Sequence, residues 1–194
     1  MRYEVKSFDN ILGTRGFSDK LLQNHFVLYQ GYVNNFNKLN DILIELEKGG
    51  KFGTPEYAEL NRRFGWEWNG MRLHELYFGN LGKEGNVLKK DSELHKQIVN
   101  EFGSYEMFEK DFKSMGAMRG IGWVVLYYDD LGGRLFNVWI NEHDVGHLSG
   151  AKPILVMDVF EHAYMLDYGI KKADYIDAFF EAINWEVVLE RFSR

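Results

Sequence analysis

The chain has no cysteine among its 194 residues. This absence excludes disulfides, thiolate metal ligands and cysteine nucleophiles, so a bound metal must take nitrogen and oxygen ligands. No apolar run is long enough to span a bilayer, and the N-terminal stretch "MRYEVKSFDNILG" lacks the apolar core of a signal peptide. We therefore expect a soluble cytoplasmic protein that is not associated with a membrane.

Excess positive charge is also missing. The formal net charge is -6 and the sequence pI is about 5.5, and the aromatic segments lack interleaved lysine and arginine. A broad nucleic-acid surface is therefore not expected. A small anionic substrate stays compatible with this composition, because a local lysine cluster can attract it whatever the net charge.

The composition indicates a well-packed protein, with 45% hydrophobic and 16% aromatic residues. Apolar residues between Ser18 and Gly49 recur with helical spacing, and Ser18 is a candidate N-cap. A second helix is expected from Thr54–Pro55 to about Phe78. Two long helices joined by a short loop predict an antiparallel hairpin.

The pattern changes after the glycine-rich segment 79–86. Two short helices are expected over 92–102 and 104–117, strand–turn–strand over 122–141, a third strand over 153–160 and one helix over 173–192. The predicted class is α+β: an N-terminal long-helix antiparallel hairpin, then a C-terminal α/β domain with a small three-stranded antiparallel meander sheet flanked by helices. We place the domains at 1–82 and 83–194, with the functional site between them.

Histidines on apolar faces are the first candidate functional residues. His25 lies on the apolar face of the first predicted helix, and His74 lies in "GMRLHELYFGNL" on the second. A single such histidine is more often a core residue with a backbone partner than a ligand. Antiparallel helices can, however, bring the two imidazoles together.

The segment "DVFEH" adds an acid, Asp158, and a third imidazole, His162, directly after the apolar stretch "PILVM". An unpaired carboxylate buried there would be costly, so a salt bridge or coordination must compensate. Three imidazoles with one carboxylate suit iron or manganese and also zinc.

Several other sites are absent from the sequence. "HELYF" begins like a zinc-protease helix but has Phe78 where the second histidine belongs. No GxSxG, Walker A or GxGxxG motif occurs. The hydrolase and nucleotide-binding motifs therefore give no competing interpretation.

Four segments resemble the iron/manganese superoxide dismutase family, in the order and at the separations of that family. They are "NHFVLYQGYVNNFNKL", "GMRLHELYFGNL", "GWVVL" and "DVFEHAYMLDYG...ADYIDAFFEAINWEVV". The resemblance extends from about residue 8 to 192, and "DxxEHAY" followed by "INWE" is its most specific part. It implies a helical hairpin followed by an α/β domain.

The resemblance implies one iron or manganese ion per subunit, with a solvent molecule as fifth ligand. Its protein ligands would be His25, His74, Asp158 and His162. The implied reaction is the disproportionation of superoxide to dioxygen and hydrogen peroxide by an ion that cycles between its M(III) and M(II) states.

Further positions follow from the same resemblance. Tyr32 matches a gateway tyrosine that relays protons, and Trp123 matches a tryptophan that walls the pocket. Glu161 matches an acid that reaches the metal-binding histidine of the other subunit, which implies a homodimer, with a tetramer as the alternative. Lys172 matches the basic residues of the substrate funnel less specifically. Outside this pattern, these residues would be core aromatics and surface charges.

The sequence departs from the family pattern around the gateway. Tyr32 follows His25 by seven positions instead of eight, so we expect a regular helix, with Tyr29 replacing a midway histidine in the gateway network. The glutamine that bonds the metal-bound solvent is missing. As in a minority of members, several archaeal ones among them, histidine stands in its place: His143, with His147 as the alternative.

A further departure lies in "EHAYM", where Met165 replaces a common tyrosine that usually bonds the midway histidine. Two other functions stay open at this point. One is zinc-dependent hydrolysis at the same cluster, and the other is a degenerate metal-binding member without dismutase activity.

Overall fold

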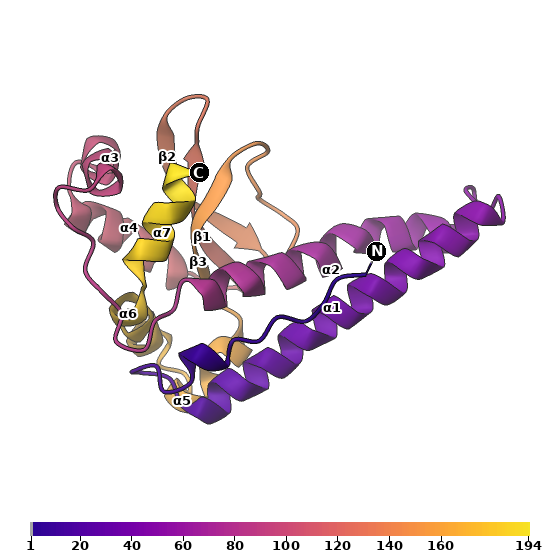
Figure 1. Ribbon diagram of the computed structural model, residues 1–194, viewed down its shortest axis with the longest axis horizontal. Coiled ribbons are helices and arrows are strands. Elements are labelled where there is room, and N and C mark those ends of the chain that lie inside the picture. Colours follow the sequence, from indigo (N-terminus) through magenta and orange to yellow (C-terminus); the bar gives the residue numbers. More distant parts are fainter. Residues whose placement is uncertain (1) are drawn as a thin grey trace.

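Two long antiparallel helices form the first part of the chain in the computed structural model, which describes residues 2–194 (Figure 1). A short helical turn, η1 (Asp9–Ile11), precedes α1 (Asp19–Lys48) and α2 (Pro55–Gly79). The hydroxyl of Ser18 accepts the N–H of Leu21, and that of Thr54 accepts the N–H of Tyr57, so both helices begin at their predicted caps. The far end of the hairpin projects beyond the rest of the molecule (Figure 1).

Helix α1 is α-helical throughout, and the expected absence of a bulge is confirmed. His25, Tyr29 and Tyr32 consequently share one face, with His25 and Tyr29 buried and Tyr32 half-buried. This face is directed toward α2 and the site described below.

The second part contains helices and strands, and the predicted α+β class is confirmed. Its elements are α3 (Glu93–Phe102), α4 (Tyr105–Gly116), β1 (Gly122–Asp129), β2 (Arg134–Asn141), β3 (Lys152–Asp158), η2 (Glu161–Ala163), α5 (Met165–Tyr168), α6 (Lys172–Ala182) and α7 (Trp185–Ser193). Helices lie around the sheet, and α2 runs beside it (Figure 1).

The sheet is antiparallel with the strand order β2-β1-β3, so the predicted meander is wrong in its strand order. Strand β1 occupies the centre because six consecutive residues, Gly122–Tyr127, are buried. Strand β2 has several exposed positions and fits an edge. The loop 142–151 between β2 and β3 therefore passes β1, and it brings His143 against Trp123 and His147 against Tyr127.

The single helix predicted over 173–192 is also wrong, because the chain divides into α6 and α7. Ile183 is extended and forms an isolated bridge with Leu81. Asn184 donates its N–H to the Asn80 carbonyl, and its side chain caps α7. The apolar periodicity of the sequence continues across this break, so periodicity alone does not reveal that Ile183 pairs with Leu81.

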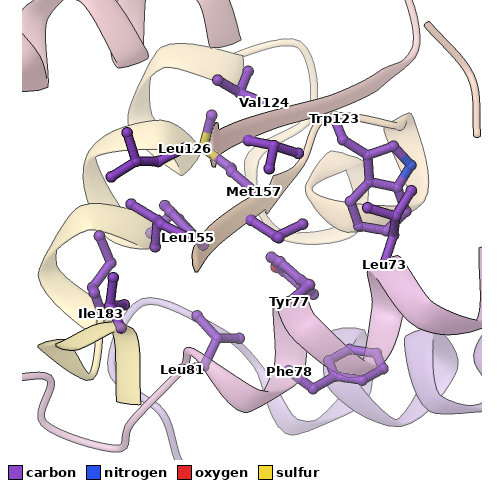
Figure 2. Packing of buried hydrophobic residues seen from close by; sticks show 14 of the residues in the cluster. Leu73, Tyr77, Phe78, Leu81, Trp123, Val124, Leu126, Leu155, Met157 and Ile183 are labelled. Carbon is purple, nitrogen blue, oxygen red and sulfur yellow. The ribbon is translucent and has the colours of Figure 1, made fainter. Parts of the chain in front are cut away.

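The core joins α2 to the sheet. Figure 2 shows Leu73, Tyr77 and Phe78 of α2 near Trp123 of β1, with Leu155 and Met157 of β3 in the same cluster. The buried side chain of Asn80 binds both backbone groups of Val156, donating over 3.2 Å and accepting over 3.0 Å. The end of α2 is thereby fixed against β3, which sets His74 relative to Asp158. Within 2–194, every helix is too short or too polar to cross a bilayer.

Candidate metal centre

Four predicted ligand residues converge between the hairpin and the sheet. His25 comes from α1, His74 from α2, Asp158 from the end of β3 and His162 from η2. One ligand atom of each lies within 4.8 Å of the others. The first three are fully buried, and the side chain of His162 is 25% exposed. Separate stretches of the chain thus bring three imidazoles and one carboxylate around a common point.

The carboxylate of Asp158 is held in one orientation. Its Oδ1 accepts the N–H of Phe160 over 2.8 Å, while Oδ2 lies 3.1 Å from Nε2 of His25 and 3.1 Å from Nε2 of His162. Tyr175 donates its hydroxyl to the Asp158 carbonyl over 2.6 Å. One carboxylate oxygen is therefore occupied by the backbone, and the other faces the imidazoles.

The orientation of His74 leaves one nitrogen available for a metal. Its Nδ1 lies 2.5 Å from the Gly70 carbonyl, and because a carbonyl only accepts, Nδ1 carries the hydrogen. The lone pair is then on Nε2, which is buried without a hydrogen-bond partner and lies 3.8 Å from Oδ2 of Asp158. A buried nitrogen without a hydrogen-bond partner needs an explanation, and coordination of a metal ion supplies one.

The charge state of the cluster also suits a cation. Burial lowers the pKa of His25 and lowers that of His74 further, so both imidazoles are neutral near pH 7. Burial alone would raise the pKa of Asp158, but His162 and His25 outweigh it and hold this pKa below its usual range. For His162 burial lowers the pKa, but the charge and hydrogen bond of Asp158 outweigh it and raise this pKa. The neutral nitrogens of His25 and His74 and the ionised oxygen of Asp158 are donors that iron, manganese or zinc takes.

Three further predicted residues, Tyr32, Trp123 and His143, form a second layer beside the cluster. The indole N–H of Trp123 donates to Nδ1 of His143 over 3.0 Å, and Nε2 of His143 lies 2.7 Å from the Tyr32 hydroxyl. Burial lowers the pKa of His143 to about 4, so the ring is neutral and has a single hydrogen. Since tryptophan only donates, that hydrogen is on Nε2 and points to the oxygen of Tyr32.

Because His143 is the donor in this hydrogen bond, the hydroxyl hydrogen of Tyr32 is free for another acceptor. Burial, with the charges of Asp158 and Glu67, raises the pKa of Tyr32 to about 12, so the phenol keeps its proton at neutral pH. Its ring is stacked on His74 with centroids 5.2 Å apart. The protonated phenol therefore stands beside the cluster with its O–H free to donate a hydrogen bond.

Gly70 makes room for that tyrosine. A Cβ built at Gly70 would lie 2.4 Å from the Tyr32 ring, closer than any side chain tolerates. Helix α2 is continuous through Gly70.

Two aromatic residues beside His143 were not singled out in the sequence. Phe160 stacks on His143 at 4.8 Å and on His162 at 5.2 Å, and Trp66 meets the edge of His143 at 4.9 Å. Phe160 directly precedes the "EH" motif, and this position could have identified it as a residue of the site. Trp66 lies eight positions before His74, and its sequence gives no comparable signal.

His147, the alternative to His143, lies one step further from the cluster. Its Nε2 bonds the His143 carbonyl over 2.9 Å, and its Nδ1 bonds the Tyr127 hydroxyl over 2.8 Å. Neither nitrogen is directed at Tyr32. Of the two histidines, the structure brings only His143 into contact with the gateway tyrosine.

Tyr29 does not join the gateway network, and this part of the expectation is wrong. Its hydroxyl donates to Glu75 over 3.0 Å and accepts the N–H of Lys6 over 3.2 Å. Burial raises the pKa of Tyr29 to about 12. Three positions separate Tyr29 from Tyr32 on α1, and the Tyr29 hydroxyl is directed at Glu75 on α2 instead of at Tyr32.

The remaining predicted residues lie at the margin of the site. Glu161 is exposed beside His162, and Met165 is 47% exposed near both. Lys172 donates to the Met118 carbonyl over 3.0 Å and lies 5.9 Å from the Trp139 ring. Lys172 therefore stands near the site without touching the cluster.

Comparison with known proteins agrees with this arrangement. Residues 90–191 match the family model described as iron/manganese superoxide dismutases, C-terminal domain. The chain is 36% identical to superoxide dismutase [Mn] 2 of Haloferax volcanii, covering 90% of this chain and 85% of that protein. It is 38% identical to superoxide dismutase [Fe] of Cupriavidus metallidurans (92% and 89%) and 36% identical to superoxide dismutase [Fe] of Aquifex pyrophilus (92% and 85%). The chain therefore belongs to the iron/manganese superoxide dismutase family.

Proposed function

We infer that this protein is a superoxide dismutase that converts two superoxide anions and two protons into one dioxygen and one hydrogen peroxide. One superoxide loses an electron and the other gains it together with both protons, so charge and atoms balance. The observation that carries this inference is the convergence of three buried imidazoles and one ionised carboxylate within 4.8 Å, in a chain of this family.

His25, His74, Asp158 and His162 are the residues that would hold the ion. An iron or manganese ion bound there supplies one-electron redox chemistry, because it is stable in both the M(II) and M(III) states. The protein contributes the orientation of the donors, since the Phe160 N–H fixes Asp158 and the Gly70 carbonyl fixes His74.

Tyr32 and His143 supply the proton chemistry. His143 donates its only N–H to the oxygen of Tyr32, which leaves the phenol hydrogen available to a substrate that takes up protons. A pKa of about 12 keeps this proton in place at neutral pH. We propose that His143 acts through Tyr32, since its single N–H cannot serve a second acceptor at the same time.

Trp123 and Phe160 exclude water from one side of the site. Trp123 is fully buried and its ring lies 5.0 Å from that of His74, while Phe160 lies between His143 and His162. The exclusion of water strengthens the hydrogen bonds within the site, and the two rings leave room for small molecules only.

The contribution of Lys172 to substrate approach stays a prediction. A cation near the entrance speeds the arrival of an anion, and salt weakens that effect. Lys172→Gln should lower kcat/KM and flatten its dependence on ionic strength, whereas Lys171→Gln, at the exposed neighbouring position, should change it less. Identical salt profiles for all three proteins would remove Lys172 from the mechanism.

We further propose that two copies pair around Glu161. Val27, Leu28, Met165 and Leu166 are between 42% and 67% exposed and line one surface pocket with Glu161 and His162. A contiguous exposed apolar patch beside a functional residue is typical of an interface. In such a homodimer Glu161 would contact His162 of the partner subunit.

Sedimentation tests the pairing. Met165→Glu should shift the protein toward monomer, while Ile170→Glu, also highly exposed but outside the pocket, should not. A monomeric wild-type protein, or a dimer unaffected by Met165→Glu, would contradict this interface. A tetramer would indicate a second interface elsewhere.

The division at residues 82 and 83 and the cytoplasmic location also stay predictions. The first segment would supply His25 and His74, and the second Asp158 and His162. Limited proteolysis within 83–91 should therefore give two fragments, one with His25 and His74 and the other with Asp158 and His162. Cell fractionation tests the location.

Metal analysis joined to a superoxide-scavenging assay tests the function. The wild-type protein should contain iron or manganese and remove superoxide catalytically. Asp158→Ala and His162→Ala should lose metal and activity, whereas His95→Ala, on α3 and remote from the cluster, should keep both. Full activity in either ligand variant would overturn the proposal.

A further inference from the structure

The loop that carries His143 is tightly constrained. Asn141 and Val145 exchange two backbone hydrogen bonds, of 2.8 and 3.4 Å, across the short turn that contains His143. Glu142, directly before His143, has a φ of +51°, in the left-handed region that non-glycine residues seldom adopt. Such a conformation persists only where the surroundings enforce it, and such positions cluster at functional sites.

His147 provides one of these constraints. The His143 carbonyl can only accept, so the 2.9 Å contact requires a hydrogen on Nε2 of His147. In the neutral ring Nδ1 is then an acceptor, and the Tyr127 hydroxyl, 2.8 Å away, donates to it. Both hydrogen bonds of the His147 ring are thus satisfied in one tautomer.

Tyr127 anchors this pair in the sheet. It lies on the central strand β1, paired with Phe136 on β2 and Pro153 on β3, and is 3% exposed. Burial raises its pKa to about 12, so its hydroxyl stays protonated. The chain of contacts runs from the central strand through His147 to the backbone of His143, and the ring of His143 then meets Trp123 and Tyr32.

We propose that His147 and Tyr127 are positioning residues that fix the His143 backbone and so aim its Nε2–H at Tyr32. This inference rests on the proposed dismutase function and goes beyond it, because neither residue touches the four ligand residues or Tyr32 through a hydrogen bond. Without the His147 contact, the His143 carbonyl loses a partner and the loop can relax away from its left-handed turn. The Nε2–H of His143 would then no longer be held on the phenol.

Four variants separate positioning from simple packing. His147→Leu removes both hydrogen bonds, and Tyr127→Phe removes only the anchor. His147→Gln keeps an amide N–H that can reach the His143 carbonyl. Tyr128→Phe is the matched control, because Tyr128 is next on the same strand and its ring packs on Phe192 at 4.5 Å.

Nitrogen NMR of the full-length protein loaded with diamagnetic Zn²⁺ reads the His143 ring directly, without activity. We expect the wild type, His147→Gln and Tyr128→Phe to show one slowly exchanging Nε2–H on His143. His147→Leu and Tyr127→Phe should show faster exchange and a mixture of tautomers. An unchanged His143 signal in both of these variants would overturn the proposal.

The redox-active protein gives a second readout. With iron or manganese bound at full occupancy, His147→Leu should lower kcat about tenfold and shift the midpoint potential, and His147→Gln should restore both. An unchanged potential and kcat in a folded, metal-replete His147→Leu would overturn the proposal. An inactive wild type would instead refute the dismutase function, while the NMR comparison still decides the positioning.

Discussion

The indole N–H of Trp123 donates to Nδ1 of His143 over 3.0 Å, and this contact fixes where the imidazole carries its hydrogen. A donor-only partner on Nδ1 forces the hydrogen of the neutral ring to Nε2, where Tyr32 receives it. The direction of the hydrogen bond between His143 and Tyr32 follows from this relationship.

Replacing Trp123 by phenylalanine should release that constraint. His143 would lose its donor at Nδ1 and could adopt either tautomer, so we expect kcat to fall about 10- to 100-fold. The unpaired buried acceptor should also cost about 1–3 kcal/mol of unfolding free energy. Trp139→Phe, on the edge strand β2, is the control. Stopped-flow kinetics with retained metal content would test the prediction, and an active Trp123→Phe with unchanged kcat would contradict it.

Replacing His143 by glutamine should keep the network and remove its pH dependence. A glutamine can accept from Trp123 and donate to Tyr32, so activity at pH 7 should be largely retained.

The sign of the stability effect follows from the pKa of about 4 for His143 in the folded protein, against about 6.5 in the unfolded chain. Between these values the unfolded state binds the proton and the folded state does not, so stability falls as the pH drops from 6.5 to 4. The loss attributable to His143 should reach about 3 kcal/mol. If the unfolding free energies of the wild type and His143→Gln change equally as the pH drops over this range, the lowered pKa of His143 is wrong.

Two glycines of α2 give a matched test of the packing around Tyr32. A Cβ at Gly70 would lie 2.4 Å from the Tyr32 ring, whereas a Cβ at Gly65 would meet nothing within 4 Å. Gly70→Ala should therefore displace Tyr32, lower activity and cost about 1–3 kcal/mol. Gly65→Ala should be neutral or stabilise the helix by about 0.5–1 kcal/mol. Equal melting temperatures and activities for the two variants would contradict the tight contact.

Metal removal should destabilise the protein strongly. Ligands from α1, α2, β3 and η2 meet at one point, so an ion bound there favours the folded state by mass action, by about 4 kcal/mol at a thousandfold excess over Kd. Thermal unfolding with and without a chelator measures this difference. Asp158→Asn should abolish most of the rise in melting temperature on addition of metal. A melting temperature that does not change with the chelator would contradict a structural contribution of the ion.

The ligand residues could be predicted because local signals make them candidates and the resemblance to the family then selects them as a set. An acid and a histidine four apart after an apolar strand, and histidines on two apolar helix faces, carry their chemistry in the sequence itself. The long helices α1 and α2 were predictable for the same reason, since Ser18 and Thr54 are caps that act on their own neighbours.

The features that sequence did not reveal depend on tertiary partners. The break at Ile183 is set by its pairing with Leu81, a contact between residues about a hundred positions apart. The destination of the Tyr29 hydroxyl is set by Glu75 on the other helix. The tautomer of His143 is set by Trp123 on β1, which the expected meander placed at an edge of the sheet although it is the central strand. Local periodicity contains none of this information.

The most direct test of the account is the rate and stoichiometry of superoxide decay for protein loaded separately with iron, manganese and zinc. The account predicts catalytic decay with iron or manganese, yielding one dioxygen and one hydrogen peroxide for every two superoxide anions, and no catalysis with zinc. Protein that is fully occupied by iron or manganese at this site and still leaves the decay rate unchanged would contradict it.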